Sequence, residues 1–247
     1  MKLHEQPRQK VINIPVFLAF EILKRGLISP FKLFIFLKSH SDGILTDDRN
    51  FISSLSLSLG GSRNSVKEWL TILKRLNWIG FDPINKTHYV RSFRNVCLME
   101  KVKPKRGVLF STSEFNKFKG FICALPYAHL RDLNIKRNRG RAVSLWGDTF
   151  QPARHSSQYI PISIKQVSKY TGLKPSKIYY FRKIAEDYGY LKVFSNIKIL
   201  PNLNPLFFYQ VNQYNNSFFR SNVFFKKDSM YLRKPDLVYT SLCFRKR

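Results

Sequence analysis

Side chains that could read the edges of DNA bases recur at helical spacing between positions 62 and 74. Polar groups fall on one side of a 3.6-residue period and apolar groups on the other. The polar set is Ser62, Arg63, Asn64, Lys67, Thr71 and Lys74, and the apolar set is Val66, Trp69, Leu70, Leu73 and Leu76. In the major groove, Arg or Lys donates to guanine and Asn pairs with adenine. The pattern predicts a reader helix, with an ordinary surface helix as the alternative.

Other chemistries are not indicated by the sequence. It contains no Gly-x-x-x-x-Gly-Lys-Ser/Thr loop for phosphates. Cys97, Cys123 and Cys243 are far apart and match no metal or redox spacing. Asp47 and Asp48 lack a nearby third ligand, so we expect them to complement a helix N-terminus rather than hold a metal. We therefore expect neither an enzyme nor a metal or cofactor site.

The elements that position the reader helix are predicted from turn residues. A first helix is expected to open at 46–48 and to end at the Gly60–Gly61 turn. After the reader helix, strands at 78–81 and 88–91 would form a hairpin, or wing, around a turn at 82–86. Lys86, His88 and Arg91 on this wing are candidate phosphate or minor-groove contacts. His88 is expected to face solvent rather than to act as a base.

The pattern returns further along the chain. A shift of 112 residues places Gly60 on Gly172, Val66 on Ile178 and Trp78 on Tyr190. The repeat predicts a second reader helix and a shorter wing, 191–199, with Ser195 and Asn196 at its tip. The candidate DNA contacts of this second helix are Lys174, Ser176, Lys177, Tyr180 and Lys183.

Each helix-turn-helix is preceded by a predicted core helix. Phe31–Ser39 follows a Ser29-Pro30 helix start and is apolar almost all round. An earlier helix would begin at Pro15 and end at Gly26. In the second half, a helix from Ser113 to Leu133 would play the same part, with a bend at Pro126.

The second half also contains an insertion at 135–159. Four cationic residues at its start are candidate DNA contacts, and a plain surface loop is the alternative. They are Lys136, Arg137, Arg139 and Arg141. The 201–247 segment is rich in aromatic and basic residues and contains short strand-like pieces. We expect it to pack on the second domain or on another subunit, while binding to single strands is the alternative.

Charge narrows the choice of partner. The 247 residues include 43 Lys and Arg against 15 Asp and Glu, which gives a net charge of +28. The basic residues occur along the whole chain, so a nucleic acid is the expected partner, ahead of an acidic protein or an anionic membrane surface. No apolar run approaches the ~18 residues that span a bilayer, so a cytoplasmic protein without a membrane partner is expected.

The segment 14–95 resembles a known family. Leu27-Ile28-Ser29-Pro30-Phe31, the helix-turn-helix and Leu76-Asn77-Trp78-Ile79-Gly80 are similar to the winged-helix DNA-binding domains of phage replisome organisers and plasmid replication initiators. The resemblance implies binding of origin DNA, recruitment of a replicative helicase or its loader, and a bacterial or phage-infected cell. Transcription regulators use the same unit. The second copy lacks the Ser-Pro start, so family roles transfer less directly there.

We therefore expect a mainly helical α+β chain with small β-wings and two tandem winged helix-turn-helix domains. The expected boundaries are 13–97 for the first domain, 98–110 for a basic linker, 111–200 for the second domain and 201–247 for a C-terminal extension. The expected function is double-stranded DNA binding, in replication initiation or in transcription. A winged-helix protein-interaction module is a further alternative, and a second copy of the chain is a further candidate partner.

Overall fold

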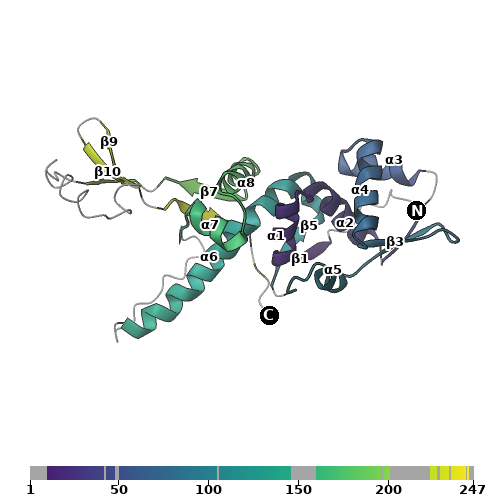
Figure 1. Cartoon of the computed structure of the whole chain (residues 1–247), viewed down its shortest axis with the longest axis horizontal. Helices are drawn as coiled ribbons and strands as arrows, with labels where there is room; N and C mark the ends of the chain where they lie inside the picture. The colour runs from purple at the N-terminus through teal and green to yellow at the C-terminus, as the bar shows by residue number, and fades with distance from the viewer. Residues whose placement is uncertain are drawn as a thin grey trace.

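The computed structural model contains helices and several small sheets, so the α+β class expected from the sequence is confirmed. Two units share an element order, the N-terminal unit (28–90) and the C-terminal unit (118–240). They lie one after the other along the long axis of the molecule (Figure 1). The structure describes residues 10–41, 43–47, 50–104, 106–145, 160–195, 197–200, 223–226, 229–233, 235–242 and 244, with backbone alone for 137–145, 197–200, 223–226 and 229–233.

The N-terminal unit is a core helix, a short strand, two helices and a hairpin. Its elements are α2 (Ile28–His40), β2 (Ile44–Thr46), α3 (Phe51–Leu59), α4 (Arg63–Arg75), β3 (Ile79–Asp82) and β4 (Thr87–Val90). The three strands form one antiparallel sheet in the order β2-β4-β3. The predicted helix, turn, helix and hairpin are therefore present. The first helix begins at Phe51 rather than at Thr46, because 44–46 pairs with β4 instead.

The C-terminal unit repeats this order. Its elements are α6 (Phe118–Leu145), β6 (Ile160–Pro161), α7 (Ile164–Thr171), α8 (Pro175–Asp187), β7 (Leu191–Phe194) and β11 (Leu237–Thr240). The sheet order is β6-β11-β7, so the last strand in sequence occupies the centre, as β4 does in the N-terminal unit. Part of the predicted C-terminal extension thus completes the sheet of the C-terminal unit.

The 112-residue repeat holds at the level of single hydrogen bonds. Helix α8 and strand β7 begin and end 112 positions after α4 and β3. Gly60 and Gly172 both adopt left-handed backbone, with φ of 68° and 73°. After them the Ser56 hydroxyl donates to the Gly61 carbonyl at 2.5 Å, and the Ser168 hydroxyl donates to the Leu173 carbonyl at 2.6 Å. The two turns are built alike.

The segments outside the two units join them. Strand β1 (Val11–Pro15) pairs antiparallel with β5 (Gly107–Ser111), although about 90 residues separate them. Helix α1 (Val16–Arg25) follows β1, and the short 3-10 helix η1 (Thr112–Lys117) follows β5. The predicted linker, 98–110, contains the end of a helix missed from sequence, α5 (Phe93–Met99), and most of β5.

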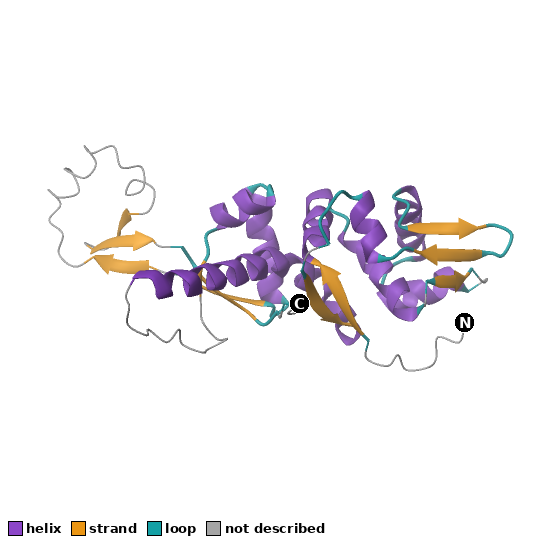
Figure 2. Cartoon of the chain, turned by 90° about the horizontal axis from the view of Figure 1, so that it is seen from below, coloured by secondary structure: helices purple, strands orange, loops and turns teal. Residues whose placement is uncertain are grey.

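The wing of the C-terminal unit differs from the expectation of a tight hairpin at 191–199. Strands β7 and β8 (Ile197–Leu200) do not pair with each other; β7 pairs with β11, and β8 pairs with β10 (Ser229–Arg233). Strand β9 (Val223–Lys226) completes an outer sheet of order β8-β10-β9. This sheet and the β3–β4 hairpin lie at opposite ends of the long axis (Figures 1 and 2).

The core runs through both units as a chain of aromatic side chains. Trp78 packs on Phe31 with ring centres 6.0 Å apart, and Phe31 lies 5.9 Å from Phe118 of α6. Further along α6, Phe121 lies 5.8 Å from Tyr190. These side chains are buried, as predicted for a helix such as α2 that is apolar almost all round. No helix within the described ranges is long and apolar enough to cross a bilayer.

Candidate nucleic-acid interface

The front of α4 is exposed because its back is buried. Val66, Leu70 and Leu73 pack into the core, which turns the opposite side of the helix to solvent. Ser62 caps the helix by accepting a hydrogen bond from the Ser65 backbone N–H at 3.1 Å. All predicted contacts of this helix and its cap lie exposed: Ser62, Arg63, Asn64, Lys67, Thr71 and Lys74. The structure therefore places this predicted set on one accessible surface.

The charge on α4 is almost entirely positive. Glu68 is the one acid in the helix, and no carboxylate among the described residues forms an ion pair with Arg63, Lys67, Lys74 or Arg75. The Lys74 ammonium lies 4.5 Å from the centre of the Phe81 ring, which orients it toward the wing. An anion that approaches this face meets cations that no carboxylate of the described residues neutralises.

Three residues of the β3–β4 hairpin were predicted to contact DNA. The side chains of two of them, His88 and Arg91, bond to other residues of the chain, and that of Lys86 forms no bond with a described residue. Lys86 is exposed in the β3–β4 turn with φ of 48°. The Arg91 Nε donates to the Asn77 carbonyl at 2.7 Å, so this guanidinium is held against the end of α4. The expectation that His88 faces solvent is wrong.

His88 is buried, with 1% of its surface exposed. Its ring packs between Phe51 and Phe81, with centre distances of 5.2 and 4.8 Å, and its Nε2 lies 3.3 Å from the Asp47 carboxylate. Burial, followed by the charge of Lys74, lowers the pKa of His88. Asp47 therefore anchors this ring and does not cap α3, whose N-cap position is Asn50.

The N-terminal half of α8 presents the second predicted set. Pro175 occupies the first helical position, and Lys174, Ser176, Lys177 and Tyr180 are exposed. The Lys177 ammonium donates to the backbone carbonyl of Lys24, at the end of α1, at 3.2 Å. Lys24 was not predicted from sequence. Its position in the sequence, in the last turn of α1, does not indicate that it lies near α8. In the structure, Lys24 lines an open hollow of about 680 Å³ together with Lys174, Ser176, Lys177 and Tyr180.

The C-terminal half of α8 is neutralised by its own acids. Arg182 lies 3.5 Å from Glu186 and 2.7 Å from Asp236, which precedes β11. Lys183, a predicted DNA contact, is exposed but lies 3.8 Å from Glu186. The repeat places Glu186 where α4 has Lys74, so the two helices share a backbone pattern but not a charge pattern.

The start of the predicted insertion is helical. Helix α6 continues through 135–145, so the backbone at Arg137, Arg139 and Arg141 is helical, with Pro126 inside the same helix. The Lys136 ammonium pairs with Asp132 at 2.9 Å. The remainder of the insertion, 146–159, lies outside the described residues, as does the strand-like piece 206–211.

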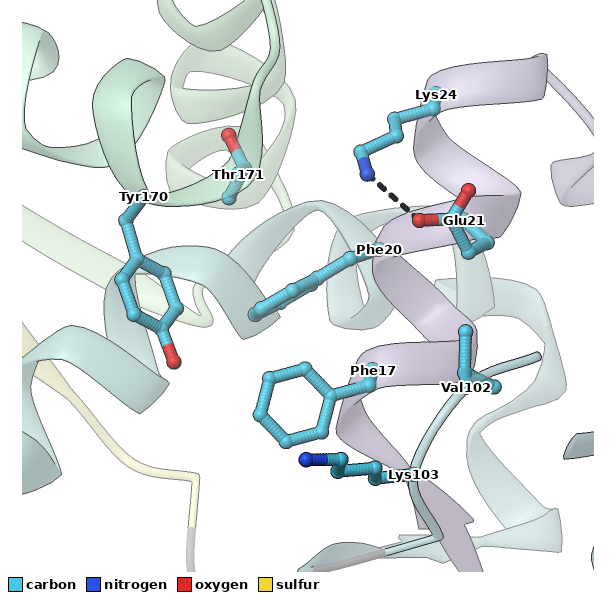
Figure 3. Close-up of a pocket in the computed structure, with 8 residues that line it drawn as sticks. All are labelled: Phe17, Phe20, Glu21, Lys24, Val102, Lys103, Tyr170 and Thr171. Carbon is cyan, nitrogen blue, oxygen red and sulfur yellow. Dashed lines mark hydrogen bonds and ion pairs between the residues drawn. The ribbon is translucent and has the colours of Figure 1, made fainter.

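A small aromatic cavity of about 200 Å³ lies between α1, which precedes the N-terminal unit, and α7 of the C-terminal unit. The Phe17, Phe20 and Tyr170 rings face it, and Lys24 pairs with Glu21 at its rim at 2.6 Å (Figure 3). Next to these rings, the buried His129 bonds the Tyr170 hydroxyl at 2.8 Å, and burial lowers the pKa of His129 to about 4. These aromatic contacts join α1 to α6 and α7.

Possible metal ligands and cysteine thiols were compared with their surroundings in the described part of the chain. It contains no group of three His, Cys, Asp or Glu side chains that could hold a metal ion. Cys97 and Cys123 are buried, and burial raises the pKa of both thiols, that of Cys123 to about 12. Comparison of the chain with protein-family models, with curated proteins and with solved structures gives no match.

Proposed function

We propose that the chain is a double-stranded DNA-binding protein with two winged-helix units. The element order strand, helix, helix, strand, strand, with the last strand central in the sheet, supports this assignment for both units. In such a unit the second helix of the pair enters the major groove, and the hairpin contacts the neighbouring backbone. These roles fall to α4 and β3–β4, and to α8 and β7–β11.

The observation that carries the proposal is the exposed face of α4. Arg63 and Lys67 project from one side of a rigid helix, beside Asn64, with no described carboxylate paired to them. Guanidinium, ammonium and amide groups are the donors that base edges in the major groove accept. Lys86 on the wing would add a phosphate contact that fixes the register of the helix on the duplex.

The two units would contribute unequally. The exposed face of α4 is available to bases along its full length, from Arg63 to Lys74. On α8, by contrast, only the first turns, with Lys174, Ser176 and Tyr180, carry donors that no described acid pairs with. We therefore assign most of the sequence choice to the N-terminal unit. The C-terminal unit would add affinity through phosphates.

We further propose a role in replication initiation, on the resemblance of 14–95 to the winged-helix domains of plasmid and phage initiators. A helicase or its loader would then be a protein partner. Selection of bound duplexes from a random pool tests this assignment. Closely iterated sites support an origin, and a single palindrome indicates a transcriptional operator instead.

Band-shift titration with a random duplex from 50 to 200 mM salt tests DNA binding itself. Neutralisation of ~6–10 phosphates lowers the affinity by about 10³–10⁵ over that range. Arg63→Ala with Lys67→Ala should weaken binding and flatten the salt slope. Arg94→Ala with Lys117→Ala, which removes two exposed cations away from α4, is the matched control and should leave both nearly unchanged. Salt-independent or undetectable binding of the full-length chain would point to a protein partner instead.

A further inference from the structure

The wing of the C-terminal unit is a long ribbon whose two central chain segments pair twice, with a third strand beside them in each part. Strand β7 pairs with β11 from Leu191↔Thr240 to Phe194↔Leu237. The same two chain segments pair again, as β8 and β10, from Ile197↔Arg233 to Leu200↔Met230. Two residues on one side and three on the other separate the two ladders. The same two chain segments therefore resume antiparallel pairing beyond this gap, with one residue more on the side of β10 and β11.

The ribbon extends far beyond the wing of the N-terminal unit. There β3 and β4 end at the pair Asp82↔Thr87, and four residues join them. The equivalent pair in the C-terminal unit, Phe194↔Leu237, is followed by six more residues, up to Leu200. At ~3.3 Å per residue these six add about 20 Å of reach, which is the length of about six base pairs.

The extension projects away from α7 and α8 (Figures 1 and 2). Strands β8, β9 and β10 pair with one another, and their sequences contain Lys198, Lys226 and Arg233 but no acidic residue. An isolated three-stranded sheet with this composition is not needed to close the core, because β11 already completes the β6-β11-β7 sheet.

We propose that this ribbon lies along duplex DNA beyond the segment contacted by α8 and binds the phosphate backbone there. The inference rests on the proposed DNA-binding function. Charge favours a polyanion over a second copy of the chain, because another copy would bring further cations to the same strands. Antiparallel ribbons are also a shape that follows DNA grooves and backbones.

Deletion of 197–233 tests the proposal. It leaves Ser195, Asn196, Lys234, Pro235 and Asp236 between β7 and β11, a five-residue loop that hairpins tolerate, and it keeps the Arg182–Asp236 ion pair. Hydroxyl-radical footprinting on a selected duplex should show protection shortened on one flank by up to about six base pairs. An unchanged footprint would overturn the inference.

A charge variant tests the same inference with the strands kept in place. Lys198→Gln, Lys226→Gln and Arg233→Gln together should lower the magnitude of the salt slope by about 2–3, since each phosphate contact contributes ~0.9. The matched control replaces three exposed cations elsewhere, Lys10→Gln, Arg94→Gln and Lys117→Gln, and should change the slope less.

The outcomes separate the two proposals. Suppose that the full-length chain binds duplex, that Arg63→Ala weakens this binding, and that both ribbon variants have the footprint and the salt slope of the full-length chain. The ribbon inference then fails and the proposed function stands. If the full-length chain does not bind duplex, the proposed function fails. If the deletion lowers the mass measured by light scattering without shortening the footprint, the ribbon joins copies of the chain and the inference is overturned.

Discussion

Lys177 of α8 donates a hydrogen bond from its ammonium to the backbone carbonyl of Lys24, 3.2 Å away at the end of α1. The last carbonyls of a helix have no partner within it, and they carry the negative end of its dipole. An ammonium placed there satisfies one carbonyl and joins α8 to α1. A side chain expected from the sequence to bind DNA is therefore also part of the junction between α1 and α8.

Lys177→Met should weaken this junction. Loss of the charged hydrogen bond at an exposed helix end is expected to cost about 0.5–1 kcal/mol in the free energy of unfolding, which urea titration measures. Lys174→Met is the control, because Lys174 is equally exposed and its ammonium has no partner among the described residues. Equal losses in both variants would show that the bond to Lys24 contributes nothing.

Gly60→Ala and Gly172→Ala should destabilise the chain by similar amounts. Both residues have positive φ, 68° and 73°, which costs an L-residue roughly 1–2 kcal/mol. A methyl group meets nothing within 4 Å at Gly60 and meets only the Lys24 side chain, at 3.8 Å, at Gly172, so the cost is conformational rather than steric.

Urea titration of the two glycine variants and of their Asn counterparts measures this cost. Asn tolerates left-handed backbone, so Gly60→Asn and Gly172→Asn should lose less than the Ala variants. An Ala variant as stable as the wild type would mean that the turn can adopt another conformation.

The stability of the chain should fall as pH falls from about 6.5 to about 4, in part through His129. Burial lowers the pKa of His129 from 6.5 to about 4, so between these values the unfolded chain binds a proton that the folded chain does not. The free energy of unfolding is therefore fully retained above the unfolded pKa and declines through this window, by about 3 kcal/mol at most.

Equilibrium unfolding at several pH values, for the wild type and for His129→Gln, isolates this contribution. The difference between the two chains should shrink as the pH drops through the window. His88, whose pKa burial also lowers, leaves a residual decline in the variant. A pH-independent difference would mean that the pKa of His129 is the same in the folded and in the unfolded chain.

Arg63→Ala should relax sequence choice at one position of the bound site and cost on the order of 1–3 kcal/mol in affinity for the preferred duplex. Arg63→Lys is the informative companion, because it keeps the charge but loses the bidentate geometry. Selection from a random pool measures the change. A uniform loss over all sequences, without relaxed choice, would make Arg63 a phosphate contact only.

Local patterns and the repeat predicted much of the fold. Gly60, the apolar face of α4 and the 112-residue shift were sufficient to locate α8 and β7, because helical periodicity and turn residues are local features of the sequence. The exposed sets on α4 and α8 follow from the same periodicity.

Long-range pairing was not predictable in this way. Residues 191–199 have the composition of a hairpin, but β7 pairs with β11 more than 40 residues later, and β1 pairs with β5 across most of the first half. His88 was misplaced for a similar reason. Its burial depends on Phe51 and Asp47, which local sequence does not bring to it. The hydrogen bond between Lys177 and Lys24 was not predictable for the same reason, because 153 positions separate the two residues in the sequence.

The central position of β11 sets an order for biosynthesis. All strands of the N-terminal unit lie before residue 91, so this unit can form its native strand pairing while the rest of the chain is still being synthesised. In the C-terminal unit, β6 and β7 share no ladder until residues 237–240 emerge between them. A chain cut before residue 237 would therefore keep the strands of the N-terminal unit paired and leave β6 and β7 without their shared partner, with strand edges exposed to aggregation.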